Sequence, residues 1–152
     1  IGGRTDHEKK EFMHFADMLG VANRVRIVTW VHHSDIHHLM DSCIAGLAPL
    51  RDTPFNRSIT SPLKLLDYLS RSLPVIASDL PSIRFYIENG KHGHLIPPDD
   101  PDALADVFDR FVAQNGFTIM SPAVEQHAKS FLWTERGAKI MRFITDIEQS
   151  RQ

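Results

Sequence analysis

Short apolar runs alternate along the chain with longer segments in which apolar side chains recur at helical spacing. The clearest run covers residues 74–78, a β-type stretch typical of a strand that is buried on both faces of a parallel sheet. Similar runs at residues 24–29, 44–49 and 93–96 predict further strands, the last one at the sheet edge. Residues 1–3 resemble the end of another strand entering a glycine turn.

The segments between these runs predict helices. Ser34 and Asp100 stand where N-caps are preferred, Pro101 suits a first helical position, and Gly116 is predicted to interrupt the helical pattern. Residues 50–60 are polar and rich in turn formers, which predicts a long loop of the kind that carries function. The helices are expected over residues 6–19, 35–42, 81–88, 121–131 and 134–147, and from residues 62 and 101 onward. In the helix over residues 134–147, four apolar residues stand at core spacing: Ile140, Phe143, Ile144 and Ile147.

This alternation of strands and helices predicts an α/β fold: a Rossmann-like, doubly wound, mainly parallel sheet flanked by helices. In such sheets, ligands bind beyond the carboxyl ends of the strands. The loop over residues 50–60 and the helix after it lie at such an end. We therefore expect the functional site there.

A hydroxyl, a cation and a carboxylate gather at the start of the helix near residue 62. Ser61 is a good N-cap, Pro62 suits the first helical position, and Ser61, Lys64 and Asp67 are spaced three apart on one side of the first turns. A hydroxyl and a cation at a helix N-terminus favour an anion. We interpret Ser61 and Lys64 as phosphate ligands and Asp67 as an acceptor for ribose hydroxyls. A capped surface helix with an ordinary Lys64–Asp67 pair is an equally open interpretation.

Composition narrows the classes of function. The chain has 152 residues, 42% of them hydrophobic and 24% charged, as expected for one globular domain over residues 1–152. A net charge of −2 gives no general reason to bind nucleic acid. A single cysteine, Cys43, excludes an internal disulfide, and no apolar run approaches the length of a transmembrane segment. Because the chain begins without methionine and carries no signal peptide, we expect a cytoplasmic fragment of a longer protein.

Five runs in a fixed order carry a resemblance to a known family. They are VRIVTWV (25–31), IAGLAPL (44–50), SPLKLLDYL (61–69), LPVIASDLP (73–81) and IENGKHGHLIPPDDPDAL (87–104). Together they resemble the C-terminal, nucleotide-sugar-binding domain of family-four glycosyltransferases of the GT-B fold. The resemblance covers nearly the whole chain, and the ordered set is far more specific than any one run.

The resemblance implies a donor site between two Rossmann-like domains, sugar transfer with retention of configuration, and no obligatory metal or other cofactor. By position, Lys64 would stabilise the diphosphate leaving group, Asp67 would stand where a glutamate usually holds ribose, and Ser61 would add a phosphate contact. The nucleobase would meet Trp30, Val31 and His32. The implied partners are a nucleotide-sugar donor and an N-terminal acceptor domain. That absent domain could hold the enzyme at the inner membrane face.

The chain departs from the family pattern at several places. Many members have a glutamate eight positions before the ribose-binding one, and here that position is Ile59. Sugar recognition would then fall to Asn56 or Arg57 in the same loop. The family's first strand of this domain and its acceptor domain have no counterpart before residue 1. We therefore expect the chain alone to bind nucleotide weakly, if at all, and to be inactive.

Two other functions remain open: a nucleotide-sugar epimerase of similar fold, and a non-catalytic Rossmann-like binding module. The sequence does not identify the base, the sugar or the acceptor. A metal site at His32, His33, His37 and His38 is disfavoured, because no carboxylate or cysteine completes the ligand set.

Several single residues also receive predictions. Arg51, like Arg57, is read as either a phosphate ligand or a solvated charge. Asp99 is expected in a turn, while Cys43 and Trp133 are expected to pack in the interior.

Overall fold

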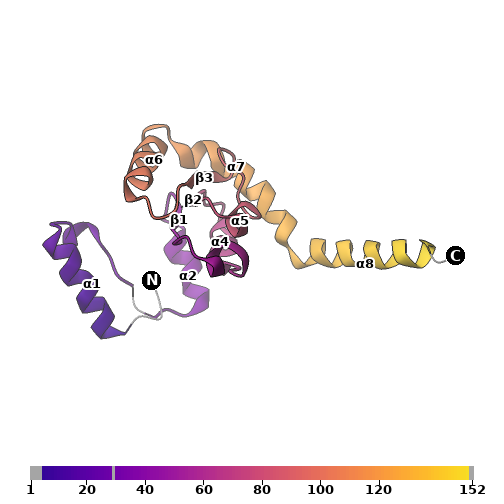
Figure 1. The fold of residues 1–152 in the computed structure, drawn as a ribbon, viewed down its shortest axis with the longest axis horizontal. Helices are drawn as coiled ribbons and strands as arrows, with labels where there is room; N and C mark the ends of the chain where they lie inside the picture. The colour runs from indigo at the N-terminus through magenta and orange to yellow at the C-terminus, as the bar shows by residue number, and fades with distance from the viewer. Residues whose placement is uncertain (1–4, 29, 151–152) are drawn as a thin grey trace. The chain divides into compact units, whose positions relative to one another are not determined.

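The computed structural model describes residues 5–28 and 30–150. The chain divides into two compact units, Ile1–Leu39 and Met40–Gln152, and each unit is described by itself. Figure 1 shows the helices and strands of both. The expectation of one domain over residues 1–152 stays a prediction. The strand expected at residues 1–3 lies outside the described residues.

The first unit is helical. Helix α1 (Asp6–Met18) begins at a capping box, in which Thr5 and Glu8 each bind the other's backbone N–H. A 3-10 helix η1 (Ala22–Arg24) follows, and the chain then runs to α2 (His33–Met40). The strand predicted at residues 24–29 is wrong over residues 24–28, and Thr29 is not described. Periodicity alone could not reveal this, because a strand forms only where another strand completes its hydrogen bonds.

The second unit is built on a parallel sheet in the order β1-β2-β3 (Gly46–Ala48, Val75–Ser78 and Gly93–Ile96). All four residues of β2 are buried, as predicted for the central strand, and β3 lies at an edge. Gly46 is paired with Val75, and Val75 with Gly93. The predicted α/β class, with a parallel sheet flanked by helices, is therefore confirmed.

The two faces of the sheet have separate cores. One core joins Val75 and Ala77 of β2 to Leu65 and Leu69 of helix α4 (Leu63–Ser70) and to Val124 of α7 (Gly116–Ala128). The other core joins alternate residues of the sheet to α6 (Pro101–Ala113), through Ile76, Ile96 and Phe111. This alternation follows from the period of two along a strand. One face of the sheet therefore packs against α4 and α7, and the other face packs against α6.

Several helix boundaries differ from prediction. Helix α4 begins at Leu63, so Pro62 occupies the N-cap position, and no side chain caps the helix. Ser34 lies within α2 rather than before it. Gly116 starts α7 instead of interrupting a helix, because Asn115 makes the turn with φ of 52°. Asp100 caps α6 as predicted by accepting the N–H of Ala103 at 2.8 Å.

The bounds of two helices differ from prediction, since α7 begins at Gly116 rather than at residue 121 and another helix ends early, and one helix was missed. Helix α5 (Pro81–Arg84) ends early, and α3 (Pro54–Ser58) occupies part of the predicted loop. The 3-10 helix η2 (Lys129–Phe131) leads into α8 (Trp133–Ser150). The four apolar residues of α8 at core spacing are not buried, and Trp133 is 81% exposed, so their predicted interior positions are wrong. Cys43 is exposed as well, so its predicted interior position is also wrong.

Candidate functional site

The candidate site lies at the carboxyl edge of the sheet, where the chain leaves β1 and enters α4. Residues 49–62 connect these two elements, and the turns after β2 and β3 lie at the same edge because all three strands are parallel. The first turn of α4 presents Lys64 at this edge. No side chain caps α4, although the Leu65 N–H donates to the Pro62 carbonyl at 2.9 Å. The positive end of the helix dipole at this start favours an anion.

Lys64 and Asp67 do not form the surface pair that was the alternative interpretation. The Lys64 side chain is exposed and makes no hydrogen bond or ion pair with any residue that the structure describes. Asp67 is half-buried, and its carboxylate is likewise unpaired within the described chain. A cation and a carboxylate one turn apart are therefore both free to meet a ligand.

Ser61 does not cap α4. Its hydroxyl lies 2.9 Å from the hydroxyl of Tyr86, which follows α5. The sequence reading missed Tyr86, because no local pattern links residues 25 positions apart. The prediction that Ser61 contacts phosphate itself stays a prediction.

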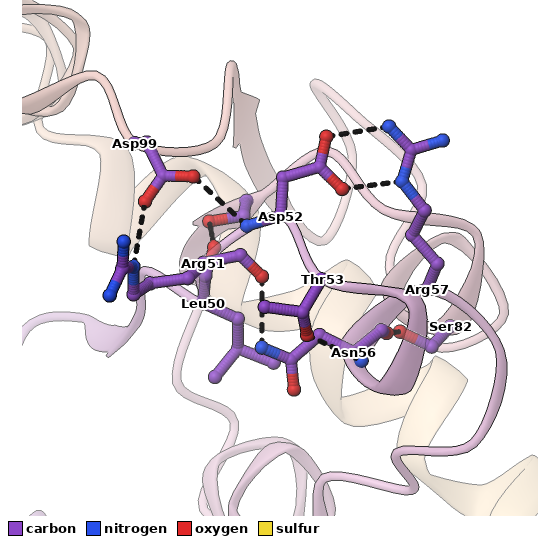
Figure 2. A network of polar contacts seen from close by, with 9 residues as sticks. Leu50, Arg51, Asp52, Thr53, Asn56, Arg57, Ser82 and Asp99 are labelled. Carbon is purple, nitrogen blue, oxygen red and sulfur yellow. Dashed lines mark hydrogen bonds and ion pairs between the residues drawn. The ribbon is translucent and has the colours of Figure 1, made fainter.

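The loop before α4 is held by its own polar network, shown in Figure 2. The Arg57 guanidinium binds the Asp52 carboxylate through two nitrogens, with Nη2–Oδ2 at 2.6 Å, and this pair lowers the pKa of Asp52 below its usual value. Asn56 donates its amide N–H to the Arg51 carbonyl at 2.8 Å and accepts a hydrogen bond from Thr60. Both predicted sugar ligands thus have structural partners in the loop.

Three residues outside the loop tie it to neighbouring elements. The Ser78 hydroxyl at the end of β2 donates to the Leu50 carbonyl at 2.6 Å, and the Ser82 hydroxyl of α5 donates to the Asn56 carbonyl at 2.5 Å. Asp99, after β3, accepts the N–H of Asp52 at 3.0 Å and lies 3.5 Å from the Arg51 guanidinium (Figure 2). Asp99 is in a turn, as predicted, with φ of 58°. The loop is therefore tied to β2, to α5 and to the turn after β3.

The residues predicted to meet the nucleobase belong to the first unit. Trp30 is 71% exposed, and its ring stands edge-on to that of His32, with centroids 6.2 Å apart. His32 also contacts the Ser34 hydroxyl at 2.9 Å, and Val31 is half-buried. Their role stays a prediction.

Neither a metal centre nor a membrane span is found in the part of the chain that the structure describes. Over residues 5–28 and 30–150, no three His, Cys, Asp or Glu side chains gather as a metal would require. No helix within those ranges combines the length and the apolar character needed to cross a bilayer.

Comparison with known proteins decides the family. The profile of the family described as "Glycosyl transferases group 1" matches residues 1–114, three quarters of the chain. The chain belongs to the group 1 glycosyl transferases. The predicted resemblance to the C-terminal half of GT-B glycosyltransferases is thereby confirmed at the level of family and fold.

Two curated relatives of this group 1 glycosyl transferase domain are bacterial. A phosphatidyl-myo-inositol mannosyltransferase of Mycobacterium leprae is 29% identical over 87 residues, which make up 57% of this chain and 23% of the relative. A putative teichuronic acid biosynthesis glycosyltransferase, TuaH of Bacillus subtilis, is 24% identical over 132 residues, 85% of this chain and 32% of the relative. The chain therefore spans between about a quarter and a third of these relatives' length.

Two solved structures share the fold at low identity. Sucrose-phosphate synthase of Thermosynechococcus elongatus superposes with a TM-score of 0.75 at 19% identity, covering 97% of this chain and 36% of that one. Anabaena HepE in complex with UDP superposes with a TM-score of 0.73 at 19% identity, covering 95% of this chain and 39% of that one.

Proposed function

We propose that this domain binds the nucleoside diphosphate sugar donor of a glycosyltransferase and seats the diphosphate at the first turn of α4. The observation that carries the proposal is the exposed Lys64, which has no partner in the described chain and stands at the uncapped start of that helix. An unpaired ammonium at the positive end of a helix dipole suits a phosphate. Family membership supplies the reaction class.

Each residue has a separate role in this proposal. Lys64 stabilises the negative charge that develops on the departing diphosphate, where electrostatic stabilisation contributes most to such a transfer. The Asp67 carboxylate, one turn further along α4, accepts hydrogen bonds from the ribose hydroxyls. Ser61 adds a contact to phosphate. The transfer retains the configuration of the sugar.

In this proposal Asn56 and Arg57 have a supporting part. Their polar groups bind Arg51 and Asp52, so they shape the wall of the sugar site from within the loop. A contact of Trp30, Val31 and His32 with the base stays a prediction from the resemblance. UDP is the favoured nucleotide, because HepE and the pneumococcal O-GlcNAc transferase GtfA were both crystallised with it.

The chain spans about a third of its structural relatives, so we also propose that it binds donor weakly and is inactive without an acceptor-binding part. A Kd on the order of 1 mM for UDP corresponds to about 4 kcal/mol of binding energy. That range is accessible to titration followed by amide chemical shifts.

The test is a titration of the 152-residue chain with UDP, GDP, ADP and uridine. We expect UDP to shift the amides of residues 61–67, and Lys64→Ala to weaken UDP binding about tenfold while leaving uridine binding unchanged, because a charge-assisted hydrogen bond contributes about 1.5–3 kcal/mol. Lys139→Ala is the matched control: Lys139 is also an exposed lysine, but it lies on α8. Equal UDP affinity of Lys64→Ala and wild type would overturn the proposal, as would the absence of any shift.

A further inference from the structure

The start of α4 is linked to the segment between α5 and β3 by one side chain. The Tyr86 hydroxyl lies 2.9 Å from the Ser61 hydroxyl, and the Tyr86 side chain is half-buried. A hydroxyl carries one proton and two lone pairs, so Tyr86 can donate to Ser61 while Ser61 donates its own proton elsewhere.

Tyr86 is held from three directions. Its ring meets Phe85 edge-on with centroids 5.0 Å apart and packs against Phe131 with centroids 5.6 Å apart. Its backbone carbonyl accepts a hydrogen bond from Nε2 of His127 at 2.9 Å. Packing of the ring and a hydrogen bond to the backbone of the same residue preorganise the hydroxyl at the tip of the side chain.

His127 is itself anchored by a second histidine. The rings of His127 and His92 are stacked at 3.8 Å, with 9° between their planes. His92 is only 4% exposed, and its Nδ1 accepts the N–H of Glu88 at 3.3 Å. The stack joins α7 to the segment before β3, so the support of Tyr86 reaches into the folded interior.

A cavity of about 620 Å³ adjoins these residues and includes Tyr86, His92 and His127 in its lining. Its two long cations are already neutralised, Arg84 by Asp79 and Lys91 by Glu88. Lys64 is not among its lining residues. The cavity wall therefore offers the proposed diphosphate no unpaired ammonium of its own.

We propose that Tyr86 is a positioning residue of the donor site, which orients the Ser61 hydroxyl toward the diphosphate. The Tyr86 hydroxyl donates to Oγ of Ser61, and this leaves the Ser61 proton directed at a phosphate oxygen. Consecutive hydrogen bonds of this kind polarise and strengthen each other. The inference rests on the proposed function, because it assigns the diphosphate to the start of α4.

The test compares UDP and uridine binding by wild type, Tyr86→Phe, Ser61→Ala and the double variant. Phenylalanine keeps the ring packing and removes only the hydroxyl. We expect Tyr86→Phe and Ser61→Ala each to weaken UDP binding about 3- to 10-fold. The double variant should bind UDP about as tightly as the single variant with the lower affinity, because both substitutions remove the same contact. Uridine binding should not change, whereas a general loss of packing would weaken both ligands.

Two outcomes would overturn the inference. One is UDP affinity in Tyr86→Phe equal to that of wild type, and the other is strict additivity of the two single variants. A ligand-free readout separates this from failure of the proposed function: the Ser61 amide should shift in Tyr86→Phe before any nucleotide is added. If Lys64→Ala fails to weaken UDP binding, the proposed function falls; if Lys64→Ala weakens binding but Tyr86→Phe does not, only the role of Tyr86 falls.

Discussion

Replacing Gly93 by alanine tests the tightest backbone approach in the sheet. Gly93 opens β3 with φ of 152° and is paired with Val75 of the central strand. A Cβ atom on Gly93 would lie 1.9 Å from the Val75 carbonyl oxygen and 2.6 Å from its nitrogen. Both atoms are backbone, so no side chain can turn aside to make room. The two strands must separate by more than about 1 Å, which breaks ladder hydrogen bonds.

The structure supplies a matched control for the size of this effect. Gly90 also has a positive φ, 80°, but nothing lies within 4 Å of the position that a methyl group would take there. Gly90→Ala therefore measures backbone strain alone, about 1 kcal/mol. Gly93→Ala adds the clash and the lost hydrogen bonds, for a total of about 3–5 kcal/mol. That total is a large share of the stability of an ordinary domain.

Urea unfolding followed by circular dichroism measures both variants. With a slope of about 2 kcal/mol/M, the midpoint should fall by about 0.5 M in Gly90→Ala and by about 2 M in Gly93→Ala. Equal midpoints for the two variants would refute the reasoning, because they would show that the sheet accepts a Cβ atom at Gly93 without separating its strands.

Two further predictions concern His92 and Gly137. Burial, and then the neighbouring His127 and Lys91, hold the pKa of His92 below its usual 6.5, so the unfolded chain takes up this proton first as the pH falls. As the pH falls from about 6.5 to the folded-state pKa of His92, the free energy of unfolding should therefore decrease. This decrease should be smaller in His92→Gln, and a variant with the same dependence of unfolding free energy on pH as wild type would contradict the prediction. Gly137 lies inside α8 with open space around it, so Gly137→Ala should stabilise that helix by about 0.8–1.0 kcal/mol. The variant should keep more helical ellipticity than wild type as both are warmed, and equal helicity of the two would count against the prediction.

Local chemistry explains which parts of the fold were predictable. The central strand, the edge strand at residues 93–96 and the cap at Asp100 were correct, because apolar runs and capping side chains act within a few residues. The helix α3 carried the same kind of signal, a threonine followed by proline, and was missed within a loop that is polar throughout. The predicted burial of the α8 stripe failed, since periodicity shows that a helix has an apolar face but not what covers it.

By itself, the sequence determined the alternation of strands and helices, the family and the position of Lys64 and Asp67 at the start of one helix, because all three depend on order and spacing. Only the tertiary structure decided that Lys64 has no partner in the described chain, that Arg57 and Asn56 are bound within their own loop, and that Tyr86 contacts Ser61. These facts depend on contacts between residues brought together by the sheet, and such contacts leave no local pattern for a sequence to show.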